Sequence, residues 1–218
     1  MKDNDYNITL SKFSHEVRNP VTLIDSFFQL MVQEHPEIET YDYYKKIREN
    51  MDILRSLLDE LTNYNHASTL HKENINIYHF LENYLETARK MLEPQGIRIE
   101  LHKLSAIPPI QLDIVKLNQL FTNLINNARD AILPNSGLIV LTLDCDGSDI
   151  IVTVKDTGCG IAPESLPSIF ELFFTGKKDG TGLGLPICKE IVLAHDGLIS
   201  ASSVPGEGTE FEMHFPIT

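Results

Sequence analysis

The fold is decided by residues 138–154, which read LIVLTLDCDGSDIIVTV. Two runs rich in Leu, Ile, Val and Thr flank the polar segment DCDGSD, a pattern that is typical of a β-hairpin. On the N-terminal side, Asp113 is a plausible N-cap for a helix that runs to about Ile132. On the C-terminal side, a second helix is expected from Leu183 to His195. Strands and helices do not alternate as repeated βαβ units, so this part is predicted to be α+β, a sandwich of helices on a mixed sheet.

The other expected elements surround this centre. They are a strand at 75–77, a helix at 78–92, a strand at 97–101 and two final strands at 198–204 and 209–217. Gly and Pro accumulate between Gly158 and Pro186, where one short helix is expected. A loop of that length inside a compact domain is either misassigned or a functional lid. We therefore look for the chemistry there.

The N-terminal part of the chain is different, because it is compatible with helix almost throughout. Apolar residues recur every three or four positions in two stretches separated by residues 35–40, which predicts a helical hairpin with two heptad seams. A lone hairpin exposes its seam, so two copies are expected to pair into a homodimeric four-helix bundle. The alternative is a two-helix layer packed on the rest of the chain. The expected domains are residues 1–68 and 69–218.

Composition excludes several classes of protein. The 218 residues are 42% hydrophobic and 22% charged, which is ordinary for a globular protein and excludes disorder. The net charge of −13 argues against nucleic acid as a partner. Three cysteines without close pairing fit a reducing compartment, and no apolar run is long enough to span a membrane. We expect a cytoplasmic segment without membrane contact, and this expectation is compatible with a membrane-anchored full-length parent.

One helical octet, residues 13–20 (FSHEVRNP), suggests nucleophilic chemistry. His15 follows the seam position Ser14, which places it at the solvent edge of the bundle. Glu16 is able to accept the Nδ1 proton, which leaves Nε2 free to attack. Asn19 lies one turn further on, within reach of a water or phosphoryl oxygen, and Pro20 is expected to kink the helix.

Further polar and glycine-rich motifs lie in the second part of the chain. Asn123 and Asn127 are one turn apart and project from one helix face. Asp156 ends a strand before Gly158 and Gly160, where a carboxylate is placed to accept from an exocyclic amine and Gly permits close backbone approach. The spacing of Gly180, Gly182 and Gly184 before a helix fits a phosphate cradle, and matches neither a dinucleotide-binding fingerprint nor a P-loop.

Taken in order, these motifs resemble those of two-component sensor histidine kinases. Residues 14–20 are similar to the H-box of the dimeric HisKA type. Residues 123–128 resemble the N-box, 156–160 the G1 box, 170–174 the F-box and 180–185 the G2 box. The F-box departs from the common pattern at Leu172, where Pro is usual, and at Gly176. The short lid resembles that of the nitrogen-regulation and sporulation kinases.

The resemblance implies a HisKA hairpin joined to a Bergerat-type ATP-binding domain that uses ATP and Mg²⁺. It implies that Asn127 is the metal ligand and that Asp156 recognises the adenine amino group. Asn123 stands where the related gyrase and mismatch-repair ATPases carry a Glu that activates water, which argues for phosphoryl transfer over hydrolysis. The phosphates would be held by the segment Gly180, Thr181, Gly182, Leu183 and Gly184, and by Lys177 or Lys178 from the lid.

The resemblance further implies that His15 is phosphorylated and passes the phosphoryl group to an aspartate of a response-regulator receiver domain. Residues 16–19 (EVRN) resemble the family's phosphatase signature, so Asn19 is expected to position a water that dephosphorylates the regulator. Only 14 residues precede His15, where relatives carry their sensor, so we expect an excised core or a protein that senses through a partner. Three alternatives remain: an ATPase without phosphotransfer, a serine kinase of the anti-sigma type, and a phosphotransfer scaffold with an inactive nucleotide site.

Overall fold

The chain forms two compact units, Met1–His66 and Ala67–Thr218, each of which is described by itself. The computed structural model describes residues 2–133, 136–177 and 180–217. For residues 2–13 and 15 only the backbone is described. Among the helices of the described residues, none is both long and apolar enough to cross a membrane.

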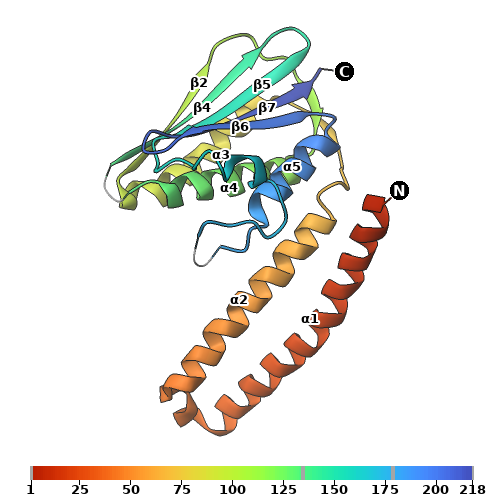
Figure 1. Ribbon diagram of the computed structural model, residues 1–218, viewed down its shortest axis with the longest axis vertical. Coiled ribbons are helices and arrows are strands. Elements are labelled where there is room, and N and C mark those ends of the chain that lie inside the picture. Colours follow the sequence, from red (N-terminus) through yellow and green to blue (C-terminus); the bar gives the residue numbers. More distant parts are fainter. Residues whose placement is uncertain (1, 134–135, 178–179, 218) are drawn as a thin grey trace. The chain divides into compact units, whose positions relative to one another are not determined.

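The first unit is the predicted helical hairpin. Helix α1 (Lys2–Glu34) and helix α2 (Asp42–Asn65) run side by side and are joined by a 3₁₀ turn at Pro36–Thr40 (Figure 1). Helix α1 continues through Pro20 without interruption. The hairpin core is formed by Val21, Met51 and Leu58, with Val17 and Leu54 packed against it.

The expected seams are only partly covered within the hairpin. Ser14, Val21 and Leu61 are buried as expected. Ile24, Met31 and Ile47 also belong to the apolar residues that recur every three or four positions in these two stretches, but they are exposed. The hairpin alone therefore leaves part of its apolar surface uncovered.

An acidic side chain, Asp25, lies in the hairpin core where the sequence pattern did not predict one. It is 2% exposed, and its carboxylate binds the guanidinium groups of Arg48, at 2.7 Å, and Arg55. The side-chain amide of Gln29, one turn further on, donates a third hydrogen bond at 3.0 Å. A buried carboxylate is tolerated because these partners replace the water that it loses.

We expect Asp25→Ala to destabilise the hairpin by about 1–2 kcal/mol. The substitution removes the shared partner of two arginines, which keep some access to water and so lose less than fully buried groups. For a unit of this size the apparent Tm of the helical transition should fall by about 5–10 °C in circular dichroism. Asp52→Ala, an exposed Asp on α2, is the control, and equal melting of both variants would contradict the assignment.

The second unit contains a five-stranded sheet in the order β2-β4-β5-β7-β6. The strands are β2 (Ile97–Lys103), β4 (Gly137–Cys145), β5 (Asp149–Asp156), β6 (Leu198–Val204) and β7 (Gly208–Pro216). Strands β2 and β4 are parallel, and the other neighbours are antiparallel. Strands β1 (Glu73–Ile75) and β3 (Ile110–Leu112) form a separate antiparallel pair. The predicted mixed sheet is therefore confirmed.

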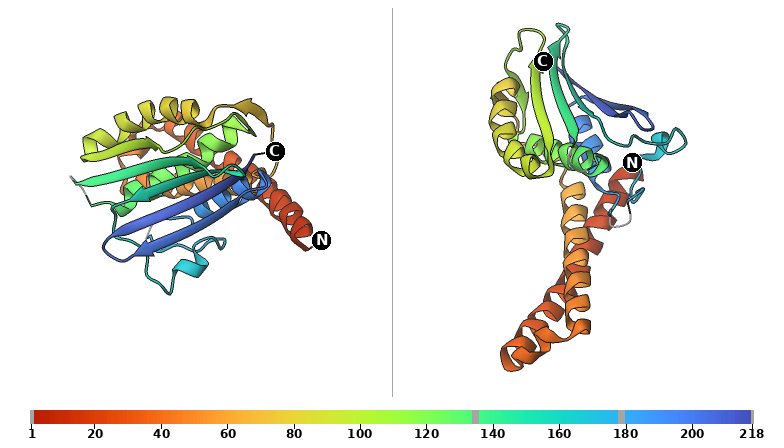
Figure 2. Two further views of the ribbon diagram at one scale, coloured as in Figure 1. Left: turned by 90° about the horizontal axis from the view of Figure 1, so that it is seen from above. Right: turned by 90° about the vertical axis from the view of Figure 1, so that its left-hand side faces the viewer.

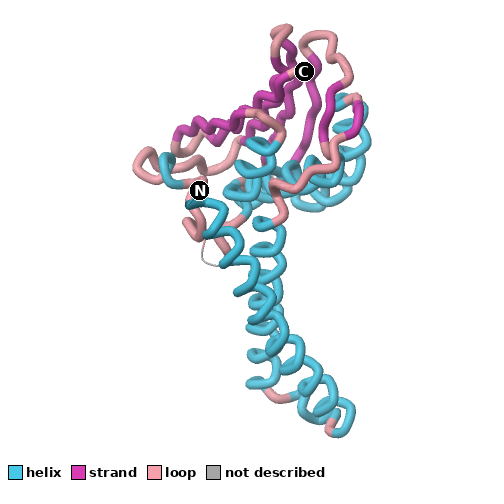
Figure 3. Tube along the Cα trace, turned by 90° about the vertical axis from the view of Figure 1, so that its right-hand side faces the viewer, coloured by secondary structure: helices cyan, strands magenta, loops and turns pink. Residues whose placement is uncertain are grey.

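Three helices cover one face of this sheet, as all views show (Figures 1, 2 and 3). They are α3 (Ile77–Leu92), α4 (Ile114–Ala131) and α5 (Gly184–Ala194). Alternate residues of β4 and β5, such as Leu141 and Val152, are fully buried against them, as the period of two requires. Helix α4 contributes a continuous buried stripe to this core: Leu117, Leu120, Phe121, Leu124, Ile125 and Ala128.

The predicted hairpin at residues 138–154 and the helix after Asp113 are confirmed. The Asp113 side chain caps α4 by accepting from the backbone N–H of Lys116 at 3.0 Å. The strand expected at 75–77 is wrong at its last two residues. The Asn76 side chain caps α3 by accepting from the backbone N–H of His79, so Ile77 already belongs to that helix. Strand β3 was missed because its three residues are too few to show periodicity.

Residues 157–183 connect β5 to α5, and we call this connection the lid. It contains a short 3₁₀ helix at Leu166–Ser168, in line with the single short helix expected there. Lys178, one of the two lysines suggested for phosphate binding, lies outside the described residues.

Candidate functional site

The polar face of α4 is the floor of the candidate site. The buried stripe of α4 faces the sheet, so Asn123, Asn127 and Asp130 lie on the more exposed side of the helix. The side-chain amide of Asn123 donates to the carbonyl of Gly184 at 3.2 Å. This hydrogen bond joins α4 to the first residue of α5, so the N-box helix and the G2 segment are neighbours.

The acidic side chain at the end of β5, Asp156, lies in a buried position beside α4. It is 3% exposed, and its Oδ1 accepts from the backbone N–H groups of Gly158 at 2.7 Å and Thr209 at 3.3 Å. Among the described residues, both hydrogen bonds to this carboxylate reach Oδ1, so Oδ2 remains as an acceptor for a ligand. Burial raises the pKa of Asp156, and the two N–H donors offset only part of that rise.

Two contacts hold the turn after Asp156 against the end of α4. The N–H of Cys159 donates to the carbonyl of Ala131 at 2.9 Å. A Cβ on Gly158 would lie 2.7 Å from the Ala131 Cβ, so a larger residue would separate the turn from the helix. Gly160 has φ +71 and would place a Cβ 2.3 Å from the carbonyl oxygen of Val204. Packing within the protein therefore explains both glycines, whereas the sequence interpretation was close approach to a base.

The neck of the lid is held by Phe173 and Gly182. The N–H of Phe173 donates to the carbonyl of Gly182 at 3.0 Å, and both residues have positive φ, +65 and +70. A Cβ on Gly182 would lie 2.4 Å from the Phe173 backbone, so no larger residue fits there. Positive φ is rare for an aromatic residue, so the Phe173 backbone is strained where it contacts Gly182.

The glycine-rich segment leads from this neck into α5. The N–H of Leu183 donates to the Thr181 hydroxyl at 3.3 Å, and Gly184 is the first residue of the helix. A Cβ on Gly180 would lie 2.5 Å from the Thr175 hydroxyl, so this glycine keeps the lid compact. The first N–H groups of a helix have no acceptor within the helix, so a helix N-terminus such as that of α5 attracts anions.

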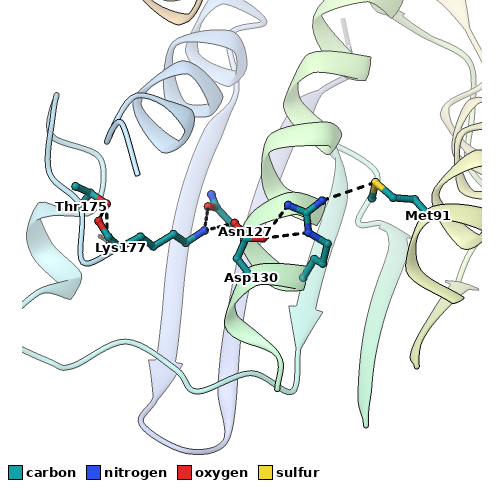
Figure 4. A network of polar contacts seen from close by, with 6 residues as sticks. Met91, Asn127, Asp130, Thr175 and Lys177 are labelled. Carbon is teal, nitrogen blue, oxygen red and sulfur yellow. Dashed lines mark hydrogen bonds and ion pairs between the residues drawn. The ribbon is translucent and has the colours of Figure 1, made fainter. Parts of the chain in front are cut away.

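A lysine in the lid reaches across to α4 (Figure 4). The Lys177 ammonium donates to Asn127 Oδ1 at 2.9 Å and to Asp130 Oδ2 at 2.8 Å. Burial raises the pKa of Asp130, but hydrogen bonds from Lys177 and Arg129 outweigh this and lower it overall. Asn127 Oδ1 thus already accepts from a cation. An amide oxygen in that setting fits a hard divalent ion such as Mg²⁺.

Asp130 was missed by the sequence analysis. The signal that would have found it is its position three residues after Asn127, which puts both side chains on one helix face. Only the asparagines of this helix face were considered, and the neighbouring carboxylate was not.

The candidate residues of the hairpin lie on α1. Ser14 is buried and its hydroxyl lies 3.2 Å from the Thr62 hydroxyl, which confirms the seam position before His15. Glu16 and Asn19 are exposed, whereas the side chain of His15 lies outside the described residues. Arg18 links α1 to α2 through hydrogen bonds to Asp59 at 2.6 Å and to the Leu58 carbonyl at 3.0 Å, a role the sequence did not indicate.

Two titratable groups near α5 serve packing. Burial raises the pKa of the Cys188 thiol to about 12, so it stays protonated. Burial lowers the pKa of His195, whose Nε2 accepts from the N–H of Asp113 at 3.0 Å while Nδ1 faces the Ile191 carbonyl at 2.8 Å. A neutral imidazole therefore joins α5 to the cap of α4.

Comparison with known proteins finds a family model that matches most of the second unit. Residues 112–218 match the histidine kinase-, DNA gyrase B- and HSP90-like ATPases. Sporulation kinase E of Bacillus subtilis strain 168 is 27% identical over 205 residues, which are 94% of this chain and 28% of that protein. Sensor histidine kinase ZraS of Salmonella typhimurium is 30% identical over 206 residues, 94% of this chain and 44% of that protein.

Solved structures agree with the sequence relatives. Full-length ShkA in complex with AMPPNP has a TM-score of 0.77 at 28% identity. The matched region covers 95% of this chain and 45% of the ShkA chain. The catalytic domain of histidine kinase ThkA has a TM-score of 0.61 at 26% identity. The matched region covers 67% of this chain and 96% of the ThkA chain. The chain spans less than half the length of sporulation kinase E and of ZraS. It is therefore homologous to sensor histidine kinases along almost its whole length, and its residues 112–218 match the histidine kinase-, DNA gyrase B- and HSP90-like ATPase model.

Proposed function

We propose that this chain is a histidine kinase core that binds Mg²⁺-ATP and transfers the γ-phosphoryl group to His15. The observation that carries the proposal is the convergence of three motif segments on α4. Asn123 bonds to the start of α5, Lys177 bonds from the lid to Asn127, and the turn after Asp156 bonds to Ala131. Adenine, phosphate and metal ligands are thereby supplied from one side of the unit.

Each of these segments has a role in nucleotide binding. Asp156 Oδ2 accepts from the adenine amino group, and the turn at Gly158 and Gly160 lies along the base. The phosphates lie on the segment Gly180, Thr181, Gly182, Leu183 and Gly184, where backbone N–H groups and the helix dipole favour negative charge. Asn127 holds Mg²⁺, which neutralises charge on the phosphates.

The transfer step uses residues of α1. The Nε2 lone pair of His15 attacks the γ-phosphorus, an N–P bond forms, the bond to the ADP oxygen breaks, and Glu16 takes the Nδ1 proton. Because the amide of Asn123 is unable to take a proton from water, the site favours transfer to the imidazole over hydrolysis. Positioning and charge neutralisation supply most of the rate.

The hairpin also supplies the partner surfaces of this proposal. Its exposed apolar side chains on α1, Leu23, Ile24, Phe27, Leu30 and Met31, recur at helical spacing. Pairing of two such faces completes a four-helix bundle, so the kinase acts as a homodimer. The phosphorylated His15 then donates to an aspartate of a response-regulator receiver domain.

The proposal is tested by incubating the chain with γ-labelled ATP and Mg²⁺. Protein-bound label that is lost in acid and retained in alkali is expected, because a phosphoramidate has that stability. A parallel reaction with EDTA should incorporate none. Release of free phosphate without protein-bound label would favour an ATPase and overturn the proposal.

We predict that Asn19→Ala lowers dephosphorylation of the receiver domain at least tenfold while His15 phosphorylation stays within twofold of native. Asn19 is exposed on α1 one turn after His15, so its amide is placed to orient a water. The loss of phospho-receiver over time, with the kinase in excess, measures this activity. Ser26→Ala, which removes an exposed hydroxyl from the same helix, is the control. Unchanged dephosphorylation in Asn19→Ala would show that the water is held elsewhere.

A further inference from the structure

The distal part of the lid contacts α4 through the ammonium group of Lys177, away from the Cys159–Ala131 hydrogen bond at the start of the lid. Lys177 binds both Asn127 and Asp130, at 2.9 Å and 2.8 Å (Figure 4). The backbone of Lys177 is held in turn by Thr175, whose hydroxyl accepts from the Lys177 N–H at 3.1 Å. The Gly180 N–H donates to the Lys177 carbonyl at 3.3 Å. Hydrogen bonds therefore hold the Lys177 backbone within the lid and its ammonium group on α4.

Asp130 is oriented for this contact by its neighbour. Its Oδ1 accepts from Arg129 Nε at 3.0 Å and Nη2 at 2.8 Å, which leaves Oδ2 toward Lys177. The far side of the guanidinium lies 3.9 Å from the Met91 sulfur on α3. The carboxylate is thus held in place by protein groups.

Asn127 Oδ1 has two candidate partners, the Lys177 ammonium and Mg²⁺. In the proposed function Asn127 Oδ1 binds Mg²⁺, yet here it accepts from the Lys177 ammonium. Two cations do not share one oxygen at contact distance, because their repulsion at a few ångströms in a partly desolvated site is strong. Lys177 must therefore leave Asn127 when the metal-nucleotide complex binds, and two anions then compete for it: the Asp130 carboxylate and the terminal phosphate.

We infer that Asp130 is a positioning residue that holds Lys177 against α4 in the absence of nucleotide and releases it to the γ-phosphate of ATP. This inference rests on the proposed function. ADP has no γ-phosphate, so with ADP bound Lys177 keeps its contact with Asp130. The pair makes the lid respond to the terminal phosphate, which is the group to be transferred.

The first test measures the contact without nucleotide. Limited trypsin digestion of the full chain should cleave after Lys177 at least threefold faster in Asp130→Asn than in the native chain, because the lysine is no longer held. Asp130→Glu, which keeps the carboxylate, should restore most of the protection. Glu171→Gln removes an exposed charge from the same lid and should leave the rate unchanged. Equal rates in the native chain and Asp130→Asn would overturn the role of Asp130.

The second test measures the release by titration calorimetry with Mg²⁺-AMPPNP and Mg²⁺-ADP. Asp130→Asn should bind AMPPNP about two- to fivefold more tightly, the range expected for losing a half-exposed competing ion pair, with ADP affinity unchanged. In a Lys177→Met background Asp130→Asn should have no effect. An equal change for both nucleotides, or an effect that persists without Lys177, would overturn the inference.

The two tests separate this inference from the function on which it rests. Failure of every variant to bind either nucleotide would overturn the proposed function and the release step together, whatever the digestion shows. Normal nucleotide binding with equal digestion rates would overturn the role of Asp130 and leave the proposed function standing.

Discussion

Replacing Asp156 by Asn is expected to weaken ATP binding about 100-fold while the folded chain stays at least as stable as the native protein. The amide keeps an oxygen for the N–H groups of Gly158 and Thr209, so the turn retains its two hydrogen bonds. It places an NH₂ group where, in the proposed function, Oδ2 would accept from the adenine amino group, so two donors would meet. Losing a charge-assisted hydrogen bond in a buried site costs ~2–3 kcal/mol, which corresponds to about 100-fold in affinity.

The stability half of this prediction follows from the raised pKa of Asp156. Burial makes ionisation unfavourable in the folded chain, so the folded-state pKa lies above the unfolded value. Such a group contributes stability at pH values below its unfolded pKa, and this contribution is lost as the pH rises through the folded pKa. At neutral pH the ionised carboxylate therefore lowers stability, and a neutral amide removes that cost.

The same pKa predicts how the pH affects native ATP binding. In the proposed function the adenine amino group donates to the ionised carboxylate, so affinity should fall as the pH drops through the raised pKa, above the range of an ordinary Asp. Calorimetry with AMPPNP across that range and thermal unfolding at neutral pH measure the two effects. Asp144→Asn, at the other end of the β4–β5 hairpin, is the control. A lower Tm with native affinity would contradict the assignment of Asp156.

Much of the second unit was predictable from local chemistry. The hairpin at 138–154 was predictable because a polar Gly-containing turn lies between two β-rich runs, and α4 because Asp113 is a strong cap. Asp156 and the glycines around 182 were recognisable because strand ends and glycine-rich turns are local features.

The contacts that bring the site together were not predictable in the same way. Lys177 and Asn127 are 50 positions apart, and no spacing rule joins a lid lysine to one particular amide. The buried Asp25 was missed for a similar reason: its arginine partners lie on the other helix, and a heptad pattern counts apolar residues only. Charge pairs that depend on tertiary packing leave no periodic signal.

His15 is the proposed acceptor of the phosphoryl group, so His15→Gln is expected to abolish protein-bound label completely. Gln has a similar length and hydrogen-bonding capacity but no nucleophilic nitrogen, so α1 should remain folded while the attack is lost. AMPPNP affinity should stay within twofold of native, because the proposed nucleotide ligands belong to the second unit.

The most direct measurement compares the native chain and His15→Gln side by side with γ-labelled ATP and Mg²⁺. We predict acid-labile, alkali-stable label on the native chain and none on His15→Gln. Label that persists in His15→Gln at the native level, or that resists acid, would contradict this account, because another residue would then be the acceptor.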